Sequence, residues 1–198
     1  MKAVFLSASV PDPQRHPRYH RTGDVVAIRD ATEALVRFVL PRGMLVWGGH
    51  PAIAPFVRHI AEELGLLNSV ETWQSEYFRD KIPKDTQRLP DIQWSSEGET
   101  RETSLLRMRE EMLSSHPIVA GIFIGGMEGV EEESDLLRRS HPECPVFHLG
   151  STGGAARFLW ESNPNRNSET QWRLGTDLKF DLLFEDILSH LFEEKDVQ

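Results

Sequence analysis

Paired glycines occur at three places along the 198-residue chain, as Gly48-Gly49, Gly125-Gly126 and Gly153-Gly154, and each pair follows an apolar run. Because glycine has no Cβ, the backbone can approach an anion closely, and the N–H groups at the start of a following helix can point at it. A single pair more often only tightens the turn between a strand and a helix. Three pairs at equivalent positions instead predict a site for a phosphate-bearing ligand.

The glycine pairs do not belong to the best-known nucleotide motifs. The sequence has neither the G-x-G-x-x-G fingerprint of the standard dinucleotide dehydrogenases nor the lysine-containing Walker loop of the P-loop NTPases. Both of these protein classes are therefore disfavoured. The histidines and carboxylates show no H-E-x-x-H or other tight metal-ligand spacing, so we expect no metal and no bound cofactor. His50, directly after a glycine pair, either donates to a phosphate or caps the next helix.

Three arginines lie in the polar connection that follows the first apolar run. Arg15, Arg18 and Arg21 stand between residues 11 and 23. They either reach over an anionic ligand or belong to a solvated loop, and the sequence slightly favours the loop.

Apolar runs and amphipathic stretches alternate in the order that would position these residues. Strand, glycine-rich turn and helix repeat along the chain, which predicts an α/β fold, a Rossmann-like, mostly parallel sheet with helices on both faces. Ligands of such sheets bind at the carboxyl ends of the strands, so we expect the loops after the strands that start at 44, 118 and 145 to converge. The expected strands cover 2–9, 44–49, 70–75, 91–95, 118–124 and 145–149, and the expected helices cover 24–40, 53–64, 100–115, 155–161, 177–194 and a stretch that ends near 139.

Length and composition restrict the protein classes. At 198 residues we expect one domain over 1–198, with the helix of about 177–194 packing on that domain or on a partner. A net charge of −9 argues against binding of duplex nucleic acid, and no apolar run is long enough to span a membrane. The single cysteine, Cys144, excludes an internal disulfide, which agrees with a cytoplasmic location.

Two segments resemble the SLOG superfamily, which includes the LOG and DprA proteins. The run AGIFIGGMEGVEEE at 120–133 is similar to the Pro-Gly-Gly-x-Gly-Thr-x-x-Glu signature of that group, and VWGG at 46–49 resembles its earlier glycine loop. The order of elements matches over most of residues 1–160. The resemblance implies a domain that binds nucleotides or their derivatives. Some members cleave an N-glycosidic bond, and others sense NAD-derived or cyclic nucleotide signals in bacterial antiphage systems.

The resemblance also implies the site residues. The hydroxyl-bearing end of the first strand matches a ligand loop, and so does the segment 150–154. The implied ligand-binding residues are Ser7, Ser9, Gly48, Gly49, His50, Gly125, Gly126, Glu128, Gly129, Glu132, Ser151, Thr152, Gly153 and Gly154.

This sequence departs from the signature of the hydrolases at several positions. Ile124 replaces the proline, Val130 replaces the threonine, and Glu128 lengthens the loop by one residue. The signature glutamate, which acts at the glycosidic centre in the hydrolases, falls on Glu133, or on Glu132 if the insertion shifts the register.

The partner arginine of that glutamate can only be Arg109. The family's Arg-Lys-x-x-Met helix is matched here by REEM at 109–112, without the lysine and with the spacing shifted by one. In a hydrolase Glu133 and Arg109 would be catalytic, whereas in a sensor Glu133 would accept hydrogen bonds from ribose hydroxyls. A run of glutamates such as 131–133 is also typical of a solvated helix face.

Three functions therefore stay open at this point. The first is a sensor of an NAD- or ADP-ribose-derived or cyclic nucleotide signal in bacterial defence or stress. The second is a LOG-like phosphoribohydrolase that releases a base from a nucleoside monophosphate, and the third is an oligomerisation module whose glycines are only turns. The expected partners are a small nucleotide-derived ligand, a second copy of the chain and, for a sensor, an effector or signal-producing protein.

Overall fold

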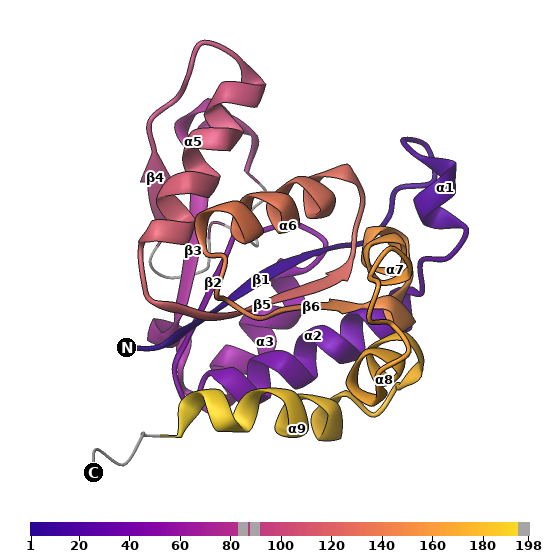
Figure 1. Ribbon diagram of the computed structural model, residues 1–198. Helices are drawn as coiled ribbons and strands as arrows, with labels where there is room; N and C mark the ends of the chain where they lie inside the picture. The colour runs from indigo at the N-terminus through magenta and orange to yellow at the C-terminus, as the bar shows by residue number, and fades with distance from the viewer. Residues whose placement is uncertain (83–86, 88–91, 194–198) are drawn as a thin grey trace.

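One parallel sheet organises the molecule. The computed structural model describes residues 1–82, 87 and 92–193, and in that part of the chain six strands form a sheet in the order β4-β3-β2-β1-β5-β6 (Figure 1). Every neighbouring pair of strands runs parallel. The Rossmann-like α/β class expected from the sequence is confirmed. The strands are β1 (Ala3–Ser9), β2 (Met44–Trp47), β3 (Val70–Ser75), β4 (Ile92–Ser95), β5 (Ile118–Gly125) and β6 (Val146–Leu149).

Helices cover both faces of the sheet, as Figure 1 shows. One face packs against α2 (Val25–Val39), α3 (Ala54–Leu64) and α9 (Phe180–Phe192). The opposite face packs against α5 (Arg101–Ser114), α6 (Glu128–Ser140) and α7 (Gly154–Glu161). The shorter helices are α1 (Pro17–His20), α8 (Glu169–Thr176) and the 3₁₀ turns η1 (Leu67–Ser69), η2 (Glu76–Lys81) and η3 (Gly150–Thr152).

The alternation of side chains along β1 creates two separate cores. Val4 and Leu6 are buried against α2 and α3, whereas Ala3 and Phe5 are buried against α5 and α6. Because successive side chains of a strand point to opposite faces, Ser7 continues the row of Ala3 and Phe5. The hydroxyl of Ser7 therefore emerges on the face that α6 covers.

Local signals in the sequence set the ends of several helices. The carboxylate of Asp24 accepts hydrogen bonds from the N–H groups of Val26 and Ala27, which caps α2. Thr100 caps α5 in the same way, through the N–H of Thr103. Gly65 ends α3 with a φ of +68°, the left-handed conformation that favours glycine at the end of a helix.

Two helices lie where the sequence predicts only loops. The stretch between 162 and 176 contains α8, which Ser168 caps through the N–H of Gln171, and the connection from 11 to 23 contains α1. Both helices are shorter than the window in which an apolar period becomes visible. Residues 91 and 194, where two of the expected elements begin and end, lie outside the described residues.

The C-terminal helix packs on the rest of the chain. Phe184 and Leu188 of α9 are fully buried, and α9 lies along α2. Nζ of Lys2 donates to the carbonyl oxygens of Leu191 and Glu193, so the N-terminus and the end of α9 are side by side (Figure 1). In the described ranges, no helix has both the length and the apolar character needed to cross a membrane.

Candidate functional site

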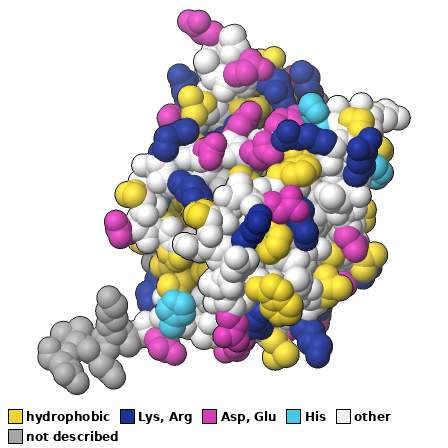
Figure 2. Space-filling model, turned by 45° about the vertical axis from the view of Figure 1, so that its right-hand side comes forward, with side chains coloured by type: hydrophobic (Ala, Val, Ile, Leu, Met, Phe, Trp, Pro, Cys, Tyr) yellow, Lys and Arg dark blue, Asp and Glu magenta, His cyan; other side chains and the backbone are white. Residues whose placement is uncertain are grey.

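A cavity of about 390 Å³ opens at the carboxyl ends of β1 and β2, between α5 and α6. The strand order reverses at β1, which lies between β2 and β5, and ligands of doubly wound sheets bind beside such a reversal. The volume lies within the range of roughly 300–1,000 Å³ that is usual for small-molecule sites. Figure 2 shows acidic and basic side chains gathered beneath the lobe that carries α5.

One hydrogen-bonded network forms the floor of this cavity. Oε2 of Glu133 accepts a hydrogen bond of 2.6 Å from Oγ of Ser7, and Oε1 accepts one of 3.1 Å from Nε of Arg109. Nη1 of Arg109 also donates to Oε2 of Glu132 at 2.7 Å. The side chains of Arg109 and Glu133 are only 11% and 16% exposed, whereas that of Glu132 is 59% exposed. The enclosed part of the network is therefore Ser7, Glu133 and Arg109.

Two facing helices bring Arg109 into this position. Arg109 projects from α5 towards the first two turns of α6, where Glu132 and Glu133 stand. A Cβ on Gly129 would lie 3.4 Å from Nη2 of Arg109, an ordinary contact distance, so the backbone of α6 at Gly129 lies beside the guanidinium. Burial opposes the charge of Arg109, but Glu133 and Glu132 outweigh it, and the pKa of the guanidinium is raised above its ordinary value.

His50 lines the cavity and caps a turn at the same time. Its Nδ1 accepts a hydrogen bond of 3.2 Å from the N–H of Ala52. Burial, helped by the charge of Arg15, lowers the pKa of His50 to about 4, so the ring is neutral at pH 7. Because Nδ1 is the acceptor, the proton of the neutral ring is on Nε2, which leaves one donor for a ligand.

The three glycine pairs differ in what their backbones do. Gly48 and Gly49 line the cavity, and Gly49 has a φ of +63°. The N–H of Gly125 instead donates to Oγ1 of Thr152 at 2.8 Å, and that of Gly126 donates to the carbonyl of Ser9 at 2.7 Å. Both of these N–H groups are thus used within the protein.

The third pair, in the loop after β6, also lies outside the cavity wall. Gly153 donates to the carbonyl of Gly150 at 3.1 Å, and Gly154 donates to Oγ1 of Thr22 at 3.0 Å. A Cβ on Gly153 would lie 1.7 Å from the carbonyl oxygen of Thr22, so this loop is packed closely against the segment before α2. Ser151 also lies away from the cavity. The loops after β2 and β5 meet at the cavity as expected, but the loop after β6 does not reach it. The end of β1 takes the third place in the cavity wall.

The arginine-rich connection lies against α6 through ion pairs. Arg15 lines the cavity, and its Nη2 is 2.5 Å from Oε1 of Glu128, whose Oε2 is buried without a hydrogen-bond partner. Arg18 pairs with Glu131 at 2.9 Å and stacks on the ring of Tyr19. Of the three arginines in this connection, only Arg15 belongs to the cavity wall.

Several residues of the wall carry no motif in the sequence. Lys81 and Arg101 contribute cations, and residues of η2, α5 and the positions next to η2 and α6 contribute an apolar band. One face of α5 carries Arg101, Leu105 and Met108, which are spaced by four and three residues. This spacing is the feature of the sequence that could have placed them together. The apolar band consists of Phe78, Ile82, Leu105, Met108 and Met127.

Two other side chains of reactive types, His148 and Cys144, lie away from the cavity wall. His148 is buried and bonded to Oγ of Ser134 at 2.8 Å, which makes it a satisfied core group. Cys144 is half-buried, and burial raises the pKa of its thiol to about 11. Among the described residues, no three His, Cys, Asp or Glu side chains are placed to hold a metal ion.

Comparison with protein-family models gave a match over residues 18–188 to the model described as the SLOG cluster3 family. The match begins within α1 and ends within α9, so it includes both helices that enclose the cavity. A search of curated proteins found no match to the chain.

Proposed function

Because the chain belongs to the SLOG cluster3 family, we propose that it binds a phosphorylated nucleoside derivative in the cavity between α5 and α6. An NAD- or ADP-ribose-derived or cyclic nucleotide is the ligand we favour, and the role we propose is that of a sensor in bacterial defence or stress signalling. Membership in this family supports a nucleotide-binding or LOG-like domain.

The observation that carries this proposal is the network of Ser7, Glu133 and Arg109. A carboxylate has about four lone-pair sites on its two oxygens, and Ser7 and Arg109 use one on each. The remaining sites can accept hydrogen bonds from the two hydroxyls of a ribose. Because Ser7 and Arg109 hold the carboxylate in place, little side-chain entropy is lost when it binds a ligand.

The same network favours binding over cleavage. A phosphoribohydrolase needs Glu133 for the oxocarbenium-like charge or the water, and needs Arg109 for the phosphate. Here Nε and Nη1 of Arg109 already donate to Glu133 and Glu132, so part of its donor capacity is used by the protein's own carboxylates. A ligand that meets this arrangement is recognised by acceptors and remains intact.

The second candidate is a LOG-like nucleotide N-glycosidase, and one observation favours it. Arg109 and Glu133, the two residues that the hydrolase resemblance implies, come from different helices and meet in the cavity. If a ligand drew Arg109 away from Glu133, the freed carboxylate would lie beside the bound ribose.

One experiment tests both candidates. The protein would be incubated with nucleoside monophosphates, NAD, ADP-ribose and cyclic ADP-ribose isomers, and each sample analysed by thermal shift and by chromatography of the products. We expect a saturable rise in Tm with an intact ligand, and an affinity about tenfold lower in Glu133→Gln because a hydrogen bond to a charged acceptor is weakened. Glu161→Gln, which alters an exposed ion pair on α7, is the matched control.

The outcomes separate the candidates. Release of free base by the wild-type protein, lost in Glu133→Gln, would replace the sensor by the N-glycosidase. If none of the compounds stabilises the wild-type protein, the binding proposal fails.

A further inference from the structure

The charges in the cavity wall are unevenly distributed. On the side of α6, the wall holds the carboxylate of Glu133 at the floor and those of Glu128 and Glu132 nearer to solvent, and the two guanidinium groups near them, Arg15 and Arg109, already pair with these carboxylates. The floor and the α6 side of the cavity therefore present mainly hydrogen-bond acceptors. They suit the donor groups of a nucleoside better than a phosphate.

The opposite side of the cavity mouth, formed by η2 and the start of α5, carries the opposite charge. Lys81 is exposed and the side chain of Arg101 is 52% exposed. Among the described residues, the carboxylate nearest to Arg101 is the exposed Glu102 at 3.7 Å, and Lys81 lies over the ring of Tyr77. Neither cation pairs with a carboxylate of the cavity wall, so both can bind an anion.

The start of α6, where a phosphate would usually bind, is already occupied by negative charge. Its first turn carries Glu128 and Glu131, and anions at a helix N-terminus compete for the same positive end of the dipole. The N–H groups of Gly125 and Gly126 in the preceding turn donate to protein acceptors. A phosphate placed there would meet carboxylates and few available donors.

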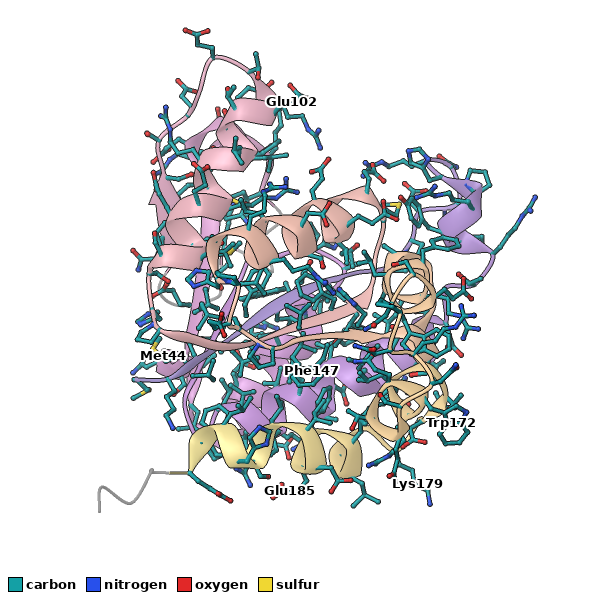
Figure 3. The ribbon with its side chains drawn as sticks, in the orientation of Figure 1. Met44, Glu102, Phe147, Trp172, Lys179 and Glu185 are labelled. Carbon is teal, nitrogen blue, oxygen red and sulfur yellow. The ribbon has the colours of Figure 1, made fainter. Side chains whose placement is uncertain are left out.

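Helix α5 connects the two ends of the cavity. It runs from the tip of the lobe, where Figure 3 labels Glu102, towards α6 (Figures 1 and 3). Arg101 and Arg109 are eight residues apart on it, a rise of about 12 Å. Leu105 and Met108 lie between them on the same face and provide an apolar surface for a base or the body of a ribose.

From these observations we infer that the ligand binds with its nucleoside part inside the cavity and its phosphate groups at the mouth, where Lys81 and Arg101 hold them. This inference rests on the proposed function and specifies the ligand further. Because the phosphates face solvent, a second phosphate adds charge beside the two cations without meeting the wall. The site therefore favours nucleoside diphosphates and their esters over monophosphates.

Calorimetric titration tests this orientation with the nucleosides, 5′-monophosphates and 5′-diphosphates of the four common ribonucleosides and with ADP-ribose. We expect the affinity to rise from nucleoside to diphosphate. Lys81→Gln and Arg101→Gln should each lower the affinity for a diphosphate by about threefold to tenfold, since each loses a charge-assisted contact at an exposed position. The affinity for the corresponding nucleoside should change by less than about twofold, because these side chains lie away from the floor.

Two control variants make the same charge changes elsewhere. Arg107→Gln removes a guanidinium from α5 outside the cavity wall, and Lys179→Gln removes an ammonium at the opposite end of the molecule (Figure 3). Neither should alter the ratio of diphosphate to nucleoside affinity. Added salt should weaken diphosphate binding in the wild-type protein more than in the Lys81→Gln/Arg101→Gln double variant.

Glu128→Gln distinguishes the two orientations of the ligand. A phosphate at the start of α6 would bind about tenfold more tightly once this carboxylate is neutral, because a like charge is removed. With the phosphate at the mouth, the variant should change diphosphate affinity by less than about threefold. The inference would be overturned if Glu128→Gln bound the diphosphate about tenfold more tightly while Lys81→Gln and Arg101→Gln left its affinity unchanged. The proposed function would still stand in that case. Failure of every compound to bind the wild-type protein would refute the proposed function itself.

Discussion

At the scale of single residues, the cavity combines side chains that are far apart in the chain. Ser7 comes from the end of β1, Arg109 from α5 and Glu133 from α6, and their hydrogen bonds close into one network. Replacing Glu133 or Arg109 would remove two contacts of this network, and it would leave a buried partner without its counterpart. His50 differs from them, since its effect depends on pH.

His50 should make the stability of the protein sensitive to moderate acid. Its folded pKa is about 4 against an ordinary value of 6.5, so between these values the unfolded chain binds more protons than the folded one. The contribution of His50 to the free energy of unfolding should therefore fall as the pH drops from 6.5 and level off below about 4. This fall should be on the order of 2 kcal/mol, after allowance for the partial exposure of His50.

Urea denaturation of the wild type and His50→Asn at several pH values measures this contribution. Oδ1 of an asparagine can take the place of Nδ1 as the acceptor for the N–H of Ala52, so the cap is kept while the titration is removed. His148, with a pKa of about 3, contributes acid sensitivity to both proteins. Identical pH profiles would show that His50 is not held neutral by burial.

The sequence predicts some of these residues and misses others for physical reasons. Glu133 and Arg109 follow from the resemblance to a family signature, and Ser7 follows from the resemblance of the hydroxyl-bearing end of the first strand to a ligand loop of that family. Lys81 and Arg101 are isolated cations in polar stretches, and their position at the cavity depends on how η2 and α5 fold over the sheet. Local patterns do not contain that information.

At the scale of elements, glycines with positive φ serve different purposes. Gly65 ends α3, and a Cβ there would meet no atom within 4 Å. Gly153 also has a positive φ, of +73°, but a Cβ there would collide with the carbonyl of Thr22. The first glycine meets only a conformational requirement, whereas the second also permits two segments to pack closely.

Alanine substitution separates these two roles. Gly65→Ala should lower the free energy of unfolding by about 1 kcal/mol, the penalty for a left-handed alanine. Gly153→Ala should lower it by at least about 3 kcal/mol, because the backbone of the neighbouring segment must move as well. Urea denaturation of both variants provides the comparison. Equal losses would mean that the loop after β6 does not depend on contact with the segment before α2.

Among the elements, those with a long apolar period are predicted well. The expected helix over 24–40 is observed as α2, and the expected strand over 118–124 as β5. The short helices α1 and α8 are missed: α1 has only four residues, and α8 has the mostly polar sequence ETQWRLGT, which shows no clear apolar period. The position of the loop after β6 is missed because it depends on the packing of its glycines.

At the scale of the whole molecule, the sheet separates two cores, and α9 belongs to one of them. Phe184 should therefore stabilise the isolated chain: Phe184→Ala should lower the free energy of unfolding by about 3–5 kcal/mol. Leu182→Ala on the same helix should change it by less than about 0.5 kcal/mol, because Leu182 is 60% exposed.

Unfolding at several protein concentrations tests where α9 packs. A midpoint independent of concentration, with the large loss confined to Phe184→Ala, would agree with packing within one chain. A large loss in Leu182→Ala, or a midpoint that rises with concentration, would show that a second copy covers α9. Association between copies stays a prediction.

The contact of Lys2 with the end of α9 has a practical consequence for handling the molecule. Both described ends lie beside the start of β1, whereas the cavity opens where β1 and β2 finish. A tether at either end would attach the protein to a sensor chip with its cavity facing the flowing solution. Because the ends are adjacent, a short peptide could also join them, and new ends could be opened elsewhere to give a circular permutant.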